Sequence, residues 1–190
     1  MEVDTRPGAA ELLRAAELGD RAAWRELVAR HTPTVWAVAR SHRLDRADAA
    51  DVVQNTWLSL LENMNRIHDP AALAAWLATT ARRHSLRLLA ARRRETPADE
   101  ARLDLAEADA ADVAVLRDVR DGVLWQAVTQ LSEHCQRVLR VVVHSPELSY
   151  QQVAAALGIP IGSIGPTRGR CLAELRRKAS LSGLFREDAR

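Results

Sequence analysis

The chain has 190 residues, of which 47% are hydrophobic and 27% charged, and its formal net charge is +2 at pH 7. This apolar content is enough for one or two small cores but too little for a large enzyme. Gly and Pro are scarce, with eight and seven residues, whereas the helix formers Ala, Leu, Arg and Glu are abundant. We therefore predict an all-α protein made of two small helical domains.

The first helices are predicted from their end signals. Residues 9–18 have a helical apolar pattern that Gly19 should terminate, and Asp20 is placed to cap the next helix. That second helix is expected to end near Thr32 and Pro33, because the residue before a proline disfavours helical geometry.

An amphipathic helix from Asp48 onward has one apolar side and one polar side. The apolar side is predicted to face the core and contains Val52, Val53, Thr56, Trp57, Leu60, Leu61 and Met64. Asp51, Gln54 and Asn55 lie on the opposite side, where they are available to a partner.

A basic helix end follows a polar loop. The loop spans residues 63–68, and Asp69 with Pro70 then starts a helix that contains Trp76. Six arginines occur toward the end of this helix without an intervening acid: Arg82, Arg83, Arg87, Arg92, Arg93 and Arg94. Cationic side chains beside a polar loop suit single-stranded or opened nucleic acid. The alternative is a solvated basic face with Trp76 in the core.

An acidic segment separates the two halves of the chain. Residues 95–121 contain nine acids against three arginines and few large apolar residues, so this segment can hardly form a core of its own. We predict that it is the interdomain linker. The resulting divisions are an N-terminal extension (1–19), a first domain (20–94), the linker (95–121), a second domain (122–180) and a tail (181–190).

The second domain is predicted to begin with helices on either side of Ser132. Ser149, with Gln152 three residues later, forms a capping box for a short helix that Gly158 terminates. A basic helix at about 164–178 follows after a turn. A short helix, a Gly-containing turn and a basic helix are typical of a helix-turn-helix, whose second helix enters the DNA major groove. The alternative is an ordinary helical hairpin with a solvated basic end.

The last helix carries the charges that DNA binding needs. Its five basic residues, against one acid at Glu174, are Arg168, Arg170, Arg176, Arg177 and Lys178. Arginine contacts guanine bidentately and also neutralises phosphate. Because Pro166 is tolerated only in the first helical turn, the helix should start at Ser163 or Gly165.

Neither export nor catalysis is indicated. Cys135 and Cys171 lie far apart without a C-x-x-C pairing, so we expect neither a disulfide framework nor a thiolate zinc site. Residues 1–10 lack a signal pattern and no apolar run approaches about 18 residues, which predicts a soluble cytoplasmic protein without membrane insertion. The motifs of P-loop proteins, zinc proteases and serine hydrolases do not occur, and no histidine pairs with an acid at ligand spacing. The sequence therefore predicts no enzyme, no cofactor and no metal site.

Three segments match motifs of a known family. Residues 48–55, with the sequence DAADVVQN, resemble a D-x-x-D-x-x-Q-[ED] helix, and residues 75–77 and 81–83 resemble an A-W-L…A-R-N segment. Residues 148–164 match the helix-turn-helix of the same family. In these motifs the chain resembles the extracytoplasmic-function (ECF) sigma factors, the two-domain group of the bacterial sigma-70 family. The similarity extends from about residue 20 to residue 178.

The resemblance implies a protein that binds core RNA polymerase, through the β′ clamp helices and the β flap, and directs promoter-specific initiation. The polymerase-binding residues would be Asp48, Asp51, Gln54 and Asn55. The −10 element would be contacted by Asn63, Asn65, Arg66, His68, Arg82, Arg83 and Arg87. The −35 element would be contacted by Ser163, Pro166, Thr167, Arg168 and Arg170. Capture of a flipped base by the loop at 63–69 would offset the cost of unstacking it.

The chain departs from the family pattern at several positions. Gly165 and Pro166 replace two polar residues that face DNA, and Arg168 occupies an apolar position, so base readout must be reorganised. Asn55 replaces an acid of the polymerase-binding motif. The resemblance also implies an anti-sigma factor or another regulator that masks the polymerase-binding face. The linker would either thread toward the RNA exit path or serve as a tether.

Two other functions stay open at this stage. A stand-alone dimeric helix-turn-helix regulator would bind palindromic duplex DNA, whereas a sigma factor uses an asymmetric two-part promoter. A protein that only sequesters another protein through its helical faces would be unaffected by the substitution Arg170→Ala.

Overall fold

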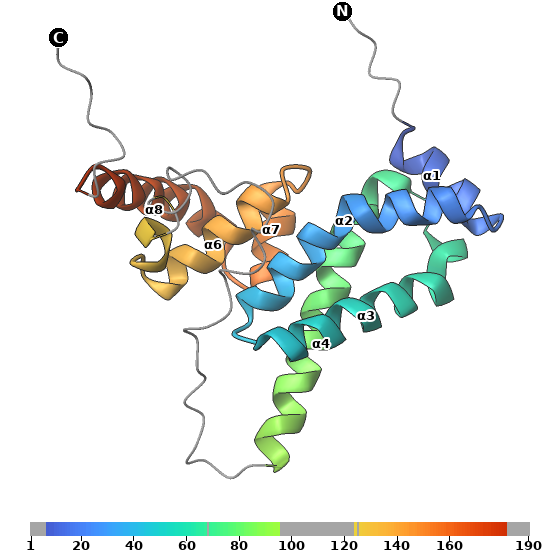
Figure 1. The fold of residues 1–190 in the computed structure, drawn as a ribbon, viewed down its shortest axis with the longest axis horizontal. Helices are drawn as coiled ribbons and strands as arrows, with labels where there is room; N and C mark the ends of the chain where they lie inside the picture. Colours follow the sequence, from blue (N-terminus) through green and yellow to red (C-terminus); the bar gives the residue numbers. More distant parts are fainter. Residues whose placement is uncertain (1–6, 68, 96–123, 125, 182–190) are drawn as a thin grey trace, which may run out of the picture.

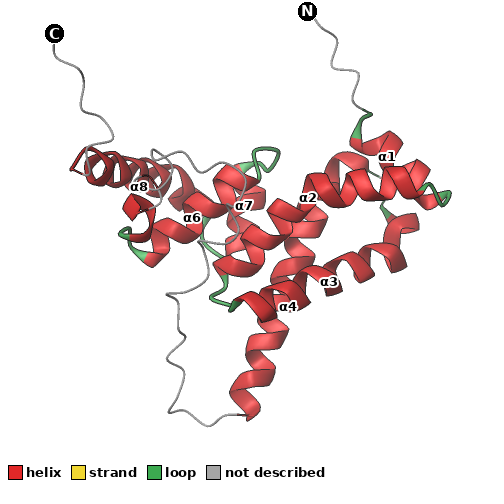
Figure 2. Cartoon of the chain, viewed as in Figure 1, coloured by secondary structure: helices red, strands yellow, loops and turns green. Residues whose placement is uncertain are grey.

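The computed structural model describes residues 7–67, 69–95, 124 and 126–181, and within these ranges every regular element is a helix (Figures 1 and 2). The elements are α1 (Ala9–Glu17), α2 (Arg21–Ser41), α3 (Arg46–Asn63), η1 (Met64–Arg66), η2 (Pro70–Ala72), α4 (Leu73–Glu95), α6 (Glu133–His144), α7 (Tyr150–Leu157) and α8 (Ile161–Leu181). Residues 124 and 126–129 are also helical. No described helix is both long and apolar enough to cross a membrane. The predicted all-α class is confirmed.

The predicted helix ends are confirmed where the signal is local. The Asp20 carboxylate accepts hydrogen bonds from the second and third backbone amides of α2, at 2.7 and 3.2 Å. Ser149 and Gln152 form the capping box of α7. Gly158 ends α7 in the left-handed conformation, with φ +68°, which glycine adopts without steric cost.

α2 continues through Pro33, so the prediction that it ends near Thr32 is wrong. A proline inside a helix leaves the carbonyl four residues earlier without its amide partner and costs about 3 kcal/mol. Here that carbonyl belongs to Ala29, which is exposed and can be hydrated. Leu27 before the proline and Val35 after it are both fully buried in one core, and their burial favours a single continuous helix.

α8 also contains a proline, and its start corrects a second predicted boundary. The helix begins at Ile161 rather than at Ser163 or Gly165, so Pro166 lies in its second turn. The carbonyl that loses its amide partner belongs to Gly162, which is exposed to water. As in α2, the proline is accommodated because it lies on the outer side of the helix.

The two helical modules share one hydrophobic core. α1 to α4 form the first module and α6 to α8 the second. α2 packs on α1, α3 and α4 and also on α6, while α4 packs on α7 (Figure 1). One buried cluster contains Val35, Val38 and Leu77 of the first module and Val141 and Leu157 of the second. The modules therefore lie against each other, and the predicted linker beyond Glu95 is outside the described residues.

Cys135 of α6 and Cys171 of α8 form a disulfide, so the expectation of no disulfide is wrong. Their Cα atoms are 5.2 Å apart because α6 and α8 pack side by side. The bond lies in a small separate cluster with the buried side chains of Leu131 and Leu139. A separation of 36 residues carries no pairing signal in the sequence, and only the packing of the two helices brings the cysteines together.

We expect reduction of this disulfide to destabilise the second module. A bridge that spans 36 residues stabilises a fold by about 3–4 kcal/mol when it constrains the unfolded chain. Urea titrations of the oxidised and reduced chain, followed by circular dichroism, should differ by this amount. The double variant Cys135→Ser with Cys171→Ser should be insensitive to reductant. Equal stabilities of the oxidised and reduced wild-type chain would contradict the prediction.

Candidate polymerase and nucleic-acid interfaces

The outer side of α3 carries the predicted polymerase-binding residues, with one exception. Asp51, Gln54 and Asn55 are exposed, and Asp51 lies about one turn before the other two. Asp48 lies on another side of the helix and is only 6% exposed. Its carboxylate accepts a hydrogen bond from Arg92 Nη2 of α4 at 2.5 Å. Asp48 therefore ties α3 to α4 and its side chain is not available to a partner.

The surroundings of Asp48 disfavour its charged form. Burial raises the pKa of this carboxyl and the neighbouring Asp45 carboxylate raises it further, whereas Arg92 lowers it. The contact with Arg92 therefore does not fully offset the cost of burial. One carboxylate oxygen of Asp48 also lacks a hydrogen-bond partner among the described residues. This residue has a structural role that the sequence motif did not reveal.

Two leucines extend the outer side of α3. Leu58 and Leu61 are 48% and 50% exposed, whereas Trp57 and Leu60 occupy the buried side. The prediction that Leu61 belongs to the core is therefore wrong, and Leu58 was missed. The available signal for Leu58 was its position three residues after Asn55 on an otherwise polar side. We define the α3 face as Asp51, Gln54, Asn55, Leu58 and Leu61.

The loop after α3 is short and anchored at its start. Asn63, the last residue of α3, donates a hydrogen bond from Nδ2 to the Ser59 carbonyl at 2.8 Å. Asn65 and Arg66 follow in η1 and are exposed. His68 lies outside the described residues. Among the residues predicted to contact the −10 element, Asn65 and Arg66 are thus the accessible ones of this loop.

The arginines of α4 divide between two sides of the helix. Arg83 and Arg87 are exposed and one turn apart, as a contact with DNA requires. Arg82 faces the second module instead, and its Nη2 lies 2.9 Å from the position that a Cβ on Gly158 would occupy. Its guanidinium is thus at the C-terminal end of α7, where a cation is favourable. In this arrangement Arg82 joins the two modules. It is only partly exposed, whereas Arg83 is exposed.

Polar side chains reinforce the contact between the modules. Thr34 Oγ1 of α2 lies 3.0 Å from the His144 carbonyl and 2.9 Å from the Glu147 carboxylate, and can donate its hydrogen to either. His42 Nε2 donates to the Ala156 carbonyl at 3.2 Å. Thr34 is only 1% exposed, so its hydroxyl depends on the second module for a partner. The contact between the modules therefore includes directional hydrogen bonds as well as apolar packing.

α7, the turn at 158–160 and α8 form a helix-turn-helix. Arg168 and Arg170 of α8 are exposed. Arg168 Nη1 donates to the Tyr150 hydroxyl at 2.9 Å, and Arg170 Nη2 donates to Thr167 Oγ1 at 3.4 Å. Both guanidinium groups are therefore held by other side chains of the motif.

The other residues predicted to contact the −35 element differ in accessibility. Pro166 is exposed, and Ser163 Oγ donates to the Pro160 carbonyl at 2.6 Å. Thr167 is only 3% exposed, because it lies on the side of α8 that also buries Ile164. Its side chain faces inward, which corrects its assignment as a DNA contact; it supports Arg170 instead.

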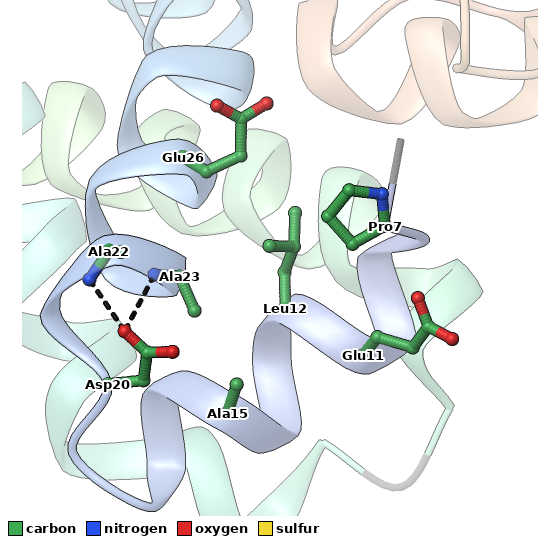
Figure 3. Close-up of a pocket in the computed structure, with 8 residues that line it drawn as sticks. All are labelled: Pro7, Glu11, Leu12, Ala15, Asp20, Ala22, Ala23 and Glu26. Carbon is green, nitrogen blue, oxygen red and sulfur yellow. Dashed lines mark hydrogen bonds between the residues drawn. The ribbon is translucent and has the colours of Figure 1, made fainter. Parts of the chain in front are cut away.

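A hollow of about 520 Å³ lies between α1 and α2 and is lined by none of the residues assigned to these surfaces (Figure 3). Its acids serve the protein itself: Glu11 accepts from the Gly8 amide, Asp20 caps α2, and Glu26 pairs with Arg30. The described residues also contain no cluster of His, Cys, Asp and Glu that could hold a metal ion. We assign the hollow no functional role.

Comparison with known proteins agrees with this arrangement. Residues 27–95, from α2 to the end of α4, match the family described as Sigma-70 region 2. The whole fold is similar to that of CnrH, solved in complex with the cytosolic domain of CnrY, at 22% identity and a TM-score of 0.51, over 90% of this chain and 96% of that one. It is also similar to the sigma factor RpoE, solved with the anti-sigma factor NepR from Bartonella quintana, at 21% identity and a TM-score of 0.52, over 83% and 97%. No curated protein sequence matches the chain.

We expect the contact between the modules to weaken in acid. Burial is the main cause that lowers the pKa of both His31 and His42, so the folded chain favours the neutral form of each. A histidine with a lowered folded pKa costs stability as the pH falls below its ordinary value of 6.5. The free energy of unfolding should therefore decrease between pH 7.5 and 5.5, by at most about 1.4 kcal/mol per pH unit for each histidine.

Urea titrations across this range measure the effect. The variant His42→Gln, whose amide can still donate to the Ala156 carbonyl, should show a shallower pH dependence. A replacement at the exposed His134 serves as the control and should leave the dependence unchanged. An unfolding free energy that is constant, or that rises toward pH 5.5, would contradict the assignment.

Proposed function

We propose that this chain, in which residues 27–95 form a sigma-70 region 2 domain, is a sigma factor that binds core RNA polymerase and directs promoter-specific transcription initiation. One observation carries the proposal. The stretch that matches the family also carries the α3 face and the exposed arginines of α4. The likeness of the whole fold to that of the sigma factor RpoE supports it. Such a protein acts by binding, and it needs no catalysis of its own.

Polymerase binding is assigned to the α3 face. Its carboxylate and amides lie on the first half of the face and two leucines that are about half exposed lie on the second half, so the face combines polar and apolar groups as protein interfaces do. In sigma factors this helix docks on the clamp helices of the β′ subunit, and we extend that contact to Asp51, Gln54 and Asn55. Leu58 and Leu61 would supply most of the apolar area that is removed from water.

Recognition of the −10 element is assigned to the far side of the first module. Arg83 and Arg87 would hold the DNA backbone, since arginine neutralises phosphate without reading sequence. Asn65 and Arg66 would contact a base that leaves the stack, and such contacts must offset an unstacking cost of a few kcal/mol.

Recognition of the −35 element is assigned to α8. The two modules share one core in the structure, so a promoter whose elements lie further apart than these two surfaces would require the modules to separate. Separation would expose the polar contacts of Thr34 and His42 to water.

A regulatory partner is part of the proposal. The two similar structures are complexes, of CnrH with the cytosolic domain of CnrY and of RpoE with the anti-sigma factor NepR. We extend this to the present chain as an anti-sigma factor or another regulator of the ECF type. The surface to be masked would be the α3 face, because it is the one that polymerase needs.

The first test concerns the α3 face. Asp51→Arg combined with Gln54→Ala should weaken binding to bacterial core polymerase by about tenfold or more, because it replaces an acceptor by a repelling cation and removes an amide. Both residues are exposed, so the unfolding transition should not change. Glu17→Arg, an equal change of charge at an exposed position of α1, is the matched control. Retained binding by the double variant would remove the assigned docking face. A chain that binds no core polymerase yet shifts duplex DNA as a dimer would instead be a stand-alone regulator.

The second test separates the arginines of α4 by role. Arg83→Ala with Arg87→Ala should reduce transcription by the holoenzyme and lower the salt dependence of promoter binding by about 1.5 to 2 in the log–log slope, at unchanged stability. Arg82→Ala should act in the opposite way. It should lower the melting temperature of the free chain, because the guanidinium packs on the end of α7. Equal effects of the two variants on stability would contradict this division.

A further inference from the structure

The outer side of α8 is almost free of side chains over its first four turns. Its exposed residues follow helical spacing and are Gly162, Pro166, Gly169 and Ala173, with the half-buried Gly165 at the edge next to Tyr150. The opposite side carries the buried residues Ile164, Thr167 and Cys171. A Cβ built on Gly162 or Gly169 would meet no atom within 4 Å, so this side is open. In a helix-turn-helix, the side of the second helix that faces outward is the one that enters the major groove.

Two arginines flank this bare side, and the first is directed away from it. Arg168 lies at one edge, and its guanidinium donates to the Tyr150 hydroxyl at 2.9 Å. The Tyr150 ring also lies 3.9 Å from the position of a Cβ on Gly165, so the tyrosine covers one edge of the helix. Tyr150 is the first residue of α7, and the first helix of this motif crosses the DNA backbone. This places Arg168 toward phosphate.

Arg170 lies at the opposite edge. Its guanidinium is within 3.4 Å of the hydroxyl of Thr167, which is buried and fixed in the helix. Like Arg168, it is exposed and held beside the groove-facing side. The two positive charges are thus separated by a strip without hydrogen-bonding side chains.

We propose that α8 contacts the −35 duplex mainly through its phosphates, with Arg168 positioned by Tyr150 and Arg170 by Thr167, and that it discriminates poorly between −35 sequences. This inference rests on the proposed function and specifies how its −35 contact works. Direct readout needs side chains that form bidentate hydrogen bonds with base edges, and glycine, alanine and proline have none. Phosphate contacts position the protein without reading sequence. Promoter choice then depends on the −10 element.

Transcription from two template libraries tests the proposal. The holoenzyme, assembled from the full chain and bacterial core polymerase, transcribes templates randomised over six −35 positions or over six −10 positions, and the transcripts are sequenced. We expect yields within about tenfold across the −35 library and a spread of about 100-fold or more across the −10 library. Preferred −35 sequences that exceed the median by about 100-fold would overturn the proposal, while the proposed function would stand. No discrete starts from any template would overturn both.

Variants of α8 give an independent measure. Arg168→Ala should lower the yield evenly across the −35 library, and Tyr150→Phe should have the same pattern with a smaller loss. A loss confined to one base position would mean that Arg168 reads a base, and would overturn the assignment. Gly169→Gln should create a new preference of about 5- to 150-fold at one position, because a bidentate contact supplies that discrimination. No steric barrier opposes the glutamine. Arg14→Ala, at an exposed position of α1, is the control and should give the same yields across the −35 library as the wild-type chain.

Discussion

The shared core of α2 with its neighbours is the constraint on which the rest of the structure depends. α2 packs on three helices of its own module and also on α6, and its side chains Leu27, Val35 and Val38 are fully buried. A break at Pro33 would point the buried side chains before and after it in different directions and expose some of them to water. Burying one such side chain stabilises a fold by about 1.5–3 kcal/mol, so two or three of them outweigh the cost of one proline. α2 is therefore one continuous helix of the first module that also packs on the second module.

This packing decides which cations are left for nucleic acid. Arg82 and Arg92 are engaged at the end of α7 and at Asp48, so both belong to the framework of the protein. Arg83 and Arg87, which follow Arg82 in sequence, project from another side of α4 and are exposed. The basic run therefore contains arginines that contact the protein and arginines that are free to contact nucleic acid, and only the packing of α4 shows which are which. The same reasoning applies to Asp48 and Asp51 on α3.

The sequence was sufficient wherever a feature depends on neighbouring residues. The Asp20 cap, the capping box at Ser149 and the left-handed Gly158 are such features, since each involves atoms only a few residues apart. Two features that were predicted wrongly depend on contacts between distant segments. The disulfide needs α6 beside α8, and the continuous α2 needs a core that spans both modules. Helical periodicity alone also could not say that Leu61 is half exposed, because it lies at the margin of the apolar side.

The surfaces assigned to partners have in common that stability does not depend on them. The α3 face, the outer arginines of α4 and the bare side of α8 are exposed, and glycine in the middle of a helix costs about 0.5–1 kcal/mol relative to alanine. α8 carries two such exposed glycines, Gly162 and Gly169, at positions where a Cβ would meet nothing within 4 Å, together with a proline. Packing does not require these residues. These residues lower the stability of the helix without improving its packing, so we attribute them to contact with a partner. Without larger side chains on its outer side, the α8 backbone can approach a DNA duplex closely.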